Sequence, residues 1–393
     1  MAKCVFGNVI YRGPHSGFGK GEIRMDSVAA ASDRIRSIVN NGAPTRFARG
    51  WHCLGQVQKF LTQKSTSLRA FGQEIAIEAL ADGQLLARNG RCPLSQPAGT
   101  RHEHLEAFCN VHGAQDAASR SLSPCWPVLQ QDDLLFVWHD AEGAPPRAGQ
   151  SIPRIHGSNP GQWTDLVWNE ITLKADPRDV IEHLVDTATF FYESTNRPTF
   201  FKNVFEDHVA TQYFDGPMRR EYSRHATEEA PENLIWTNSV ASYFGPSFMI
   251  DELDYVHDRY DINTTLIAAH YPVDEHTLVL FCGVSVKHSE GLGLDPQEFA
   301  ADQSARILHG FGTDAEIWQQ KTRVDNPLLC EEDGPVYQMR RWYEQFFCDT
   351  AAIEPQMTDR FEYEMDTTMP LDMWKRSLAR IPVSRVTTGK QPA

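Results

Sequence analysis

A proline- and glycine-rich stretch, DAEGAPPRAGQSIPRIHGSNPG at residues 140–161, divides the chain into two parts with different hydrophobic patterns. Before it, from about Arg46 to Asp140, short apolar or alternating runs are separated by clusters of Gly, Pro, Asn and Asp. Runs such as GWHCLGQV, EIAIEAL and DLLFVWHD are typical of short strands with turns between them. The sequence therefore predicts an all-β module first, followed by a domain linker at 140–161.

The second part mixes strand and helix patterns, which is typical of an α+β fold. A helix is predicted over DPRDVIEHLVDTATFFYES (176–194), with Asp176 or Asp179 near its N-terminus, and a long helix over residues 296–321. Strands are predicted at WTDLVWNEITLKA (163–175), TFFKNVFE (199–206), ASYFGPSFMI (241–250), TTLIAAHYPV (264–273) and HTLVLFCGVSV (276–286). We expect a curved antiparallel sheet around the long helix, enclosing an apolar cavity.

The length and composition indicate a soluble protein with two domains. A chain of 393 residues exceeds one ordinary core, and its 41% hydrophobic and 23% charged residues are typical of globular proteins. The formal net charge of −15 argues against nucleic acid or an anionic membrane as a partner. We place the boundaries as an N-terminal extension and helix at 1–45, the β module at 46–145, the α+β domain at 160–375 and a tail at 376–393.

Neither a signal peptide nor a membrane-spanning run is recognisable in the sequence. The first residues, MAKCVFGNVIYRGPHSG, lack a charged segment followed by a continuous apolar one. No run approaches the roughly 18–20 apolar residues that span a bilayer. The 8 cysteines are spread thinly, unlike a secreted disulfide framework. We therefore expect a cytoplasmic protein with reduced thiols.

Two groups of reactive or aromatic residues are interpreted as structural. His52 and Cys53 are adjacent on a predicted strand, so their side chains should point to opposite faces and cannot form a catalytic pair. An aromatic set is expected in the core or in subunit contacts: Trp318, Trp342, Tyr343, Phe346 and Phe347.

Four stretches are distinctive: RFARGWHCLG (46–55), PTFFKNVFEDH (198–208), ASYFGPSFMI (241–250) and EIWQQKTRVDNPLLCEEDGPVYQMRRWYEQFF (316–347). Together they resemble the Rieske non-haem iron oxygenases, in particular the oxygenase component of bacterial 3-ketosteroid 9α-hydroxylase, over about residues 46–365. The resemblance implies a Rieske-like all-β domain followed by a helix-grip (START-like) domain with a cavity for a polycyclic substrate. It also implies a trimeric ring, in which the cluster of one subunit faces the iron of its neighbour.

The segment VDTATFFYEST (185–195) aligns without gaps with the iron-binding signature of that family, D-x2-H-x4-H. By the resemblance, Asp186 is the acid that links the iron to the neighbouring cluster, and Asp314 is the third ligand of the iron. The two histidine positions hold Thr189 and Ser194. Since a neutral hydroxyl is a weak ligand that cannot hold Fe(II) against water, we expect the mononuclear iron to be lost.

Side chains near this segment leave other arrangements open. On a continuous helix His183 lies about 240° around the axis from Thr189, so we expect it to face elsewhere. Glu193 shares a helical face with Asp186, and these two acids with Asp314 could form a carboxylate site for Mg²⁺ or Mn²⁺. The alternative is a polar remnant that holds water or a protonated acid.

The cluster-binding pattern is also incomplete. A Rieske [2Fe–2S] centre needs two Cys and two His, which the family supplies as C-x-H and C-x2-H. By the resemblance, Cys92, Cys109 and His112 are retained, whereas Leu94 stands at the position of the other His. Histidines in the spacer leave a rearranged ligand open. We interpret the module as cluster-free and expect no cofactor, although the family would use [2Fe–2S] and mononuclear Fe(II).

Three functions are compatible with this sequence. The preferred hypothesis is a catalytically silent α-type subunit that assembles with an active paralogue in a hetero-oligomeric ring, or as a homotrimer, in steroid or polycyclic metabolism. Losses at both metal sites favour it, because electrons must pass the cluster, Asp186 and the iron in series. The alternatives are an active Rieske monooxygenase acting on a steroid-like substrate, and a metal-independent enzyme or carrier that uses the apolar cavity.

Overall fold

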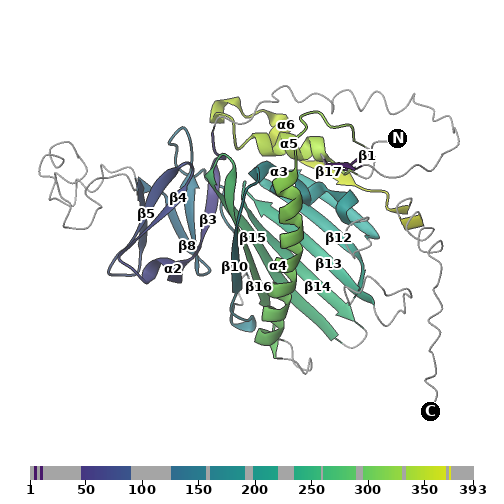
Figure 1. Cartoon of the computed structure of the whole chain (residues 1–393), viewed down its shortest axis with the longest axis horizontal. Coiled ribbons are helices and arrows are strands. Elements are labelled where there is room, and N and C mark those ends of the chain that lie inside the picture. The colour runs from purple at the N-terminus through teal and green to yellow at the C-terminus, as the bar shows by residue number, and fades with distance from the viewer. Residues whose placement is uncertain are drawn as a thin grey trace, which may run out of the picture.

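The chain folds into two small β-sheets that pack against a large antiparallel sheet, with one long helix along the large sheet (Figure 1). A computed structural model describes residues 46–89, 125–155, 160–190, 198–219, 234–257, 260–288, 295–329, 333–368 and 371–372, and the backbone of residues 4–6 and 9–11. Those last two segments are β1 (Cys4–Phe6) and β2 (Val9–Tyr11), which pair antiparallel. The predicted N-terminal helix and the tail at 376–393 lie outside the described residues.

The two small sheets occupy the part of the chain predicted to be all-β. One has the order β3-β9-β8 and the other the order β4-β5-β6-β7. The three predicted runs are confirmed as β3 (Gly50–Gln56), β5 (Gln73–Ala79) and β9 (Leu134–His139). The remaining elements are α2 (Val57–Leu61), β4 (Ser65–Ala70), β6 (Leu85–Asn89), β7 (Cys125–Trp126) and β8 (Val128–Gln131).

The large sheet has eight strands in the order β10-β16-β15-β14-β13-β12-β11-β17. Each neighbouring pair is antiparallel, as predicted. The strands are β10 (Val167–Leu173), β11 (Phe200–Glu206), β12 (Val209–Arg219), β13 (Leu234–Phe244), β14 (Phe248–His257), β15 (Tyr260–Asp274), β16 (Thr277–Val286) and β17 (Phe361–Glu364).

The prediction of a single strand over ASYFGPSFMI is wrong. This stretch contains the end of β13, a turn and the start of β14, which form a hairpin. Gly245 adopts a positive φ of 86°, a conformation that glycine takes without steric cost. The Gly-Pro-Ser sequence was the local signal for this turn.

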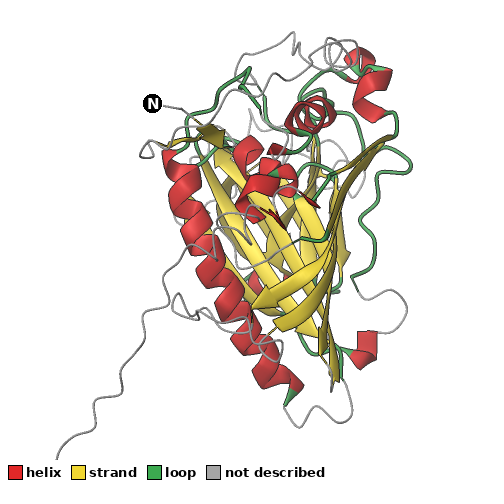
Figure 2. Cartoon of the chain, turned by 90° about the vertical axis from the view of Figure 1, so that its right-hand side faces the viewer, coloured by secondary structure: helices red, strands yellow, loops and turns green. Residues whose placement is uncertain are grey.

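The long predicted helix is confirmed as α4 (Pro296–Gln320). Its N-cap is Asp295, whose carboxylate accepts hydrogen bonds from the backbone N–H groups of Gln297 at 2.8 Å and Glu298 at 3.0 Å. The helix lies along the sheet (Figures 1 and 2), and Asn169 on β10 donates to Ser304 on the helix at 2.6 Å. Within the described part of the chain, no helix is both long and apolar enough to cross a membrane.

The described part of the chain also contains several shorter helices. They are η3 (Pro160–Gln162), α3 (Pro177–Glu182), η4 (His183–Val185), α5 (Val336–Glu344), η8 (Thr350–Ala352) and α6 (Pro355–Thr358). The aromatic set predicted to be structural is confirmed in the core: Trp318, Trp342, Tyr343 and Phe346 are buried, and Phe347 is partly buried.

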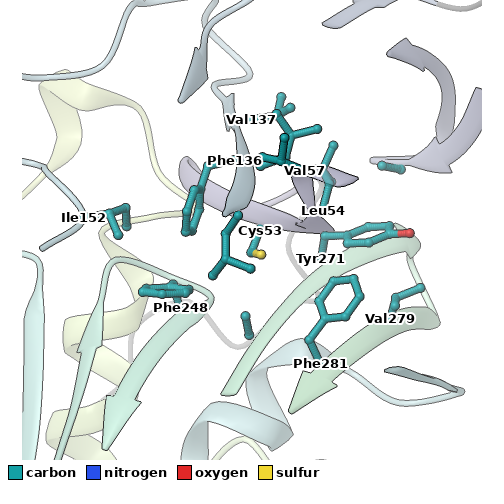
Figure 3. Packing of buried hydrophobic residues seen from close by; sticks show 14 of the residues in the cluster. Cys53, Leu54, Val57, Phe136, Val137, Ile152, Phe248, Tyr271, Val279 and Phe281 are labelled. Carbon is teal, nitrogen blue, oxygen red and sulfur yellow. The ribbon is translucent and has the colours of Figure 1, made fainter. Parts of the chain in front are cut away.

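A continuous apolar core joins the small sheets to the large one (Figure 3). Cys53, Leu54 and Phe136 of the small sheets pack in one cluster with Phe248 and Phe281 of the large sheet. Burial of this apolar surface holds the two parts of the chain together.

Candidate functional site

The helix that carries the predicted iron-site residues ends early. Its N-cap is Asp176, which is one of the two predicted residues. The helix α3 then continues as the 3-10 turn η4 and ends at Asp186. Asp186 has φ −78° and ψ 74°, which is not helical. Its carboxylate oxygen Oδ1 then accepts the backbone N–H of Thr189 at 3.2 Å, so Asp186 caps a new turn. The predicted single helix over 176–194 is therefore wrong in its described part.

This break brings His183 to the site. His183 and Asp186 both lie close enough to Asp314 on α4 for their charges to act on its carboxyl group. Its ring is 5.8 Å from the ring of Phe190 and 6.1 Å from that of Trp318. The expectation that His183 faces elsewhere is wrong, because it assumed a continuous helix. We refer to Asp186, Asp314 and His183 as the acidic cluster.

Burial perturbs one acid of this cluster. Removal from water raises the pKa of the Asp314 carboxyl above its ordinary value, the nearby charge of Asp186 adds to that effect, and His183 opposes it.

A buried ion-pair network anchors α3 just before the break. Glu182 binds the guanidinium of Arg340 through two hydrogen bonds, of 2.6 Å to Nε and 3.1 Å to Nη2. Arg323 lies 3.1 Å from Asp179 and 3.3 Å from Glu182. Burial alone would raise the pKa of Glu182, but Arg323 and Arg340 outweigh it and hold that pKa below its ordinary value. Both arginines belong to the distinctive stretch 316–347, which thus positions the site helix.

A glycine is required where the chain passes behind the acidic cluster. Gly334 has a φ of 72°, and a Cβ atom built on it would lie 2.3 Å from the carbonyl oxygen of Val185. We therefore expect Gly334→Ala to lower the free energy of unfolding by about 2–4 kcal/mol, from backbone strain and displacement of residues next to Asp186. Chemical denaturation would measure this.

The matched control for that substitution is Gly310→Ala on α4. A Cβ at Gly310 meets nothing within 4 Å, so we expect this variant to be stabilised by about 0.5–1 kcal/mol through helix propensity. Equal effects of the two substitutions would contradict the close approach at Gly334.

An apolar cavity of about 230 Å³ adjoins the acidic cluster. His183 and Phe190 line it on one side. Its apolar walls come from the large sheet and from α4, and include Leu253, Leu266, Leu280, Ile307, Phe311 and Trp318. A mainly apolar space with some polar groups in its walls is the usual form of a small-molecule site.

One acid lies in the cavity wall. Asp251 on β14 is 8% exposed and accepts a hydrogen bond of 2.7 Å from the hydroxyl of Ser239 on β13. Burial raises the pKa of the Asp251 carboxyl to about 7, against a smaller opposing effect of Ser239. Asp251 was not among the residues predicted for the site. Alternation along β14 was the available signal, because it puts Asp251 on the same face as Met249 and Leu253.

The described residues do not fit a mononuclear iron site. The acidic cluster offers one imidazole and two carboxylates, and Thr189 adds only a neutral hydroxyl. No group of three or more His, Cys, Asp or Glu in the described ranges is arranged to hold a metal ion. The charge of Asp186 acts on Asp314, whereas Ser194 and Glu193, the third acid of the alternative carboxylate site, lie outside those ranges.

The residues of the predicted cluster site are not described either. Cys92, Leu94, Cys109 and His112 all lie between residues 89 and 125, outside the described part of the chain. The strands on either side of that gap, β6 and β7, pair with each other.

Comparison with known proteins decides the family. The family described as "3-Ketosteroid 9alpha-hydroxylase C-terminal domain" matches residues 137–347. The chain is 44% identical over 371 residues to a 3-ketosteroid-9-alpha-monooxygenase oxygenase component of Rhodococcus rhodochrous, covering 90% of this chain and 94% of that protein. The chain belongs to this family of Rieske non-haem iron oxygenases.

Other members and more distant folds agree with this assignment. The oxygenase component of the same name from Mycobacterium tuberculosis is 38% identical over 383 residues, covering 91% of this chain and 97% of that protein. Among solved structures, dicamba monooxygenase bound to 3,6-dichlorosalicylic acid has a TM-score of 0.57 at 15% identity, covering 78% of this chain and 100% of that one. A Pseudomonas putida NdmA variant with theobromine has a TM-score of 0.55 at 14% identity, covering 80% and 96%. At such identities the likeness shows a shared fold.

Proposed function

We propose that this oxygenase-family member is a catalytically silent α-type subunit, which assembles with an active paralogue and keeps its cavity for a steroid-like ligand. In this proposal residues 46–145 form a Rieske-type domain and residues 160–375 a helix-grip domain. The ring is a hetero-oligomer with the active paralogue, or a homotrimer, and lies in the cytoplasm. The relatives at 44% and 38% identity are named as oxygenase components, which supports a place in a multi-component system.

The observation that carries the proposal is Thr189. It stands where the family signature has the first iron-binding histidine, directly after the retained Asp186, and its backbone N–H is bonded to the Asp186 carboxylate. A threonine hydroxyl is neutral and cannot replace an imidazole on Fe(II). The Ser194 and Leu94 positions add two more losses in the sequence, one of them in the other metal motif.

Metal analysis tests the silent part of this proposal. Protein purified without oxygen should carry far less than stoichiometric iron and acid-labile sulfide, because imidazole ligands are missing from both motifs. The Rhodococcus rhodochrous relative, prepared in parallel, should carry both and serves as the control. Stoichiometric iron and sulfide with steroid hydroxylation would instead establish the alternative, an active monooxygenase.

Co-expression tests the assembly part. A tagged copy of this chain should retain an untagged paralogue that has all its histidine ligands, and the mixed complex should hydroxylate a steroid when a reductase is supplied. A homo-oligomer that excludes the paralogue would contradict the hetero-oligomeric proposal. Thr189→His with Ser194→His in the same chain asks whether the site is otherwise intact, and iron uptake by that variant would locate the loss in these two side chains.

The buried acid in the cavity favours a second candidate, a metal-independent enzyme or carrier. Asp251 has a pKa of about 7, raised by burial, so it can accept or donate a proton near neutral pH. Both an enzyme and a carrier of this kind require that the cavity binds an apolar molecule directly, without a metal.

A further inference from the structure

A buried carboxyl group in the cavity wall has no positive charge to balance it. Asp251 is 8% exposed and lines the cavity. Among the described residues, Glu252 is the only charged group that acts on it, and that charge has the same sign. The one hydrogen bond that it accepts there comes from Ser239, at 2.7 Å on Oδ1, so Oδ2 is left for a ligand. Since a buried carboxylate without a countercharge is unfavourable, a cation that reaches it gains a strong partner.

The strand register puts a small side chain beside this carboxyl. Asp251 on β14 pairs with Ala241 on β13, and Ala241 pairs with Gln212 on β12, so the three form one row across the sheet. All three side chains line the cavity. Neighbouring strands lie about 4.8 Å apart, so a ligand atom above Ala241 is within reach of the longer side chains on both sides. The amide of Gln212 offers a carbonyl oxygen there as a second acceptor.

The described lining of the cavity supplies no competing cation for Asp251. None of these lining residues is a lysine or an arginine. The imidazole of His183 acts on Asp314 of the acidic cluster and is not among the groups that act on Asp251. Aromatic rings also line the cavity: Phe190, Phe214, Tyr243, Tyr255, Phe311 and Trp318. The faces of such rings attract ammonium groups, so these walls favour a cation as well.

We propose that the cavity binds a rigid apolar amine, with the ammonium group of the ligand on Oδ2 of Asp251 and its hydrocarbon frame against the apolar and aromatic walls. Gln212 accepts a further hydrogen bond from the same ammonium group. This inference rests on the proposed function, because it takes the cavity to be kept for an apolar ligand. It adds that this ligand carries a positive charge.

The chemistry of the site favours an amine over neutral or acidic ligands of the same shape. An ammonium group donates hydrogen bonds to Asp251 and Gln212 and also balances the buried charge. An alcohol donates one hydrogen bond and leaves the negative charge in place. A carboxylate brings a second negative charge and is repelled. Because the ammonium group loses its own water on entry, we expect a moderate gain in affinity.

Three ligands with the same frame test the inference: adamantyl amine, adamantyl alcohol and adamantyl carboxylate. The adamantane frame is rigid and smaller than a steroid, which suits a cavity of about 230 Å³. Isothermal titration calorimetry on the purified full-length protein should give a dissociation constant for the amine that is roughly tenfold lower than that for the alcohol. The carboxylate should bind most weakly. This readout needs neither iron nor turnover.

Two substitutions that each remove one negative charge assign the preference to Asp251. Asp251→Asn keeps the shape of the side chain and an acceptor for Ser239, and the preference for the amine should fall to about twofold or less. Glu252→Gln is the matched control, because Glu252 is exposed and points to the opposite face of the sheet, and it should retain the full preference. Gln212→Met removes the second acceptor and should give a preference between these two.

The outcomes separate this inference from the proposed function. Equal binding of the amine and the alcohol by the natural protein, or a preference that survives in Asp251→Asn, would overturn the inference and leave the silent-subunit proposal intact. A preference lost equally in Glu252→Gln would also overturn it, because the amine would then respond to the overall negative charge of the protein.

Binding of none of the three ligands would overturn the inference, and titration with a neutral steroid then decides the ligand part of the proposed function separately. The comparison of ligands on the natural protein decides even if a variant fails to fold. The iron content and the mixed complex do not depend on this site.

Discussion

Glu182→Gln is expected to lower the free energy of unfolding by about 3–5 kcal/mol, because it leaves the buried guanidinium of Arg340 without its countercharge. Glu182 and Arg340 are only 6% and 7% exposed, so water cannot replace the lost partner. Since this pair holds α3 against α5, the acidic cluster should loosen as well. Denaturant titration at neutral pH would measure the difference from the natural sequence.

The stability difference between the natural protein and Glu182→Gln should depend on pH. The pKa of Glu182 is below its ordinary value in the folded protein, since Arg323 and Arg340 outweigh the effect of burial. Its contribution to stability is therefore present above pH about 4.5 and is lost as the pH falls through the folded-state pKa. The gap between the natural protein and Glu182→Gln should narrow under acid conditions.

A double substitution is the control for the loss of charge. Replacing Glu182 by Leu and Arg340 by Met together removes both charges, so it should cost much less than Glu182→Gln alone. Arg323 keeps Asp179 as a partner in that variant. A cost below about 1 kcal/mol for Glu182→Gln would mean that the pair is not desolvated, and that the stretch 316–347 does not anchor the site helix in this way.

Phe281→Ala should lower the free energy of unfolding by about 3–5 kcal/mol, since it opens a cavity in the core that joins the small sheets to the large one. Phe281 is fully buried, stacks on Trp168 at 5.2 Å between ring centroids and lies 5.9 Å from the ring of Tyr271. It packs in the same cluster as Cys53 and Leu54 of the small sheets (Figure 3). Guanidinium denaturation followed by tryptophan fluorescence would measure the loss.

The same substitution at an exposed phenylalanine provides the matched control. Phe200 on β11 is 37% exposed, so Phe200→Ala should cost less than about 1 kcal/mol. If Phe281→Ala cost no more than Phe200→Ala, the junction between the sheets would not depend on apolar packing at this position.

Much of the fold followed from local pattern. The short apolar runs along β5 and β9, and the glycine and proline clusters between strands, are signals spread over many residues, so one misjudged position does not change the result. The errors came where one backbone conformation decided the outcome. A turn at Gly245 split one predicted strand into two, and a non-helical Asp186 ended one predicted helix early.

The residues of the candidate site were less predictable from the sequence than the strands and helices. The place of His183 at the acidic cluster was not predictable from local pattern, because the helical angle between His183 and Thr189 holds only while the helix continues. Asp251 could have been found from alternation along its strand, but its burial in the cavity depends on α4, which follows it by some forty positions in the sequence.

By itself the sequence determined the family, most strands and the long helix, and the identity of the side chains at the iron position, since Thr189 and Ser194 stand where the signature has histidines. Only the tertiary structure decided which groups meet. Glu182 reaches Arg340 across 158 positions, and Gly334 lies against Val185, so the orientation of Asp186 depends on a distant part of the chain. The physical reason is that local periodicity fixes the type of an element, whereas long-range ion pairs, steric fit and burial fix the direction in which each side chain points.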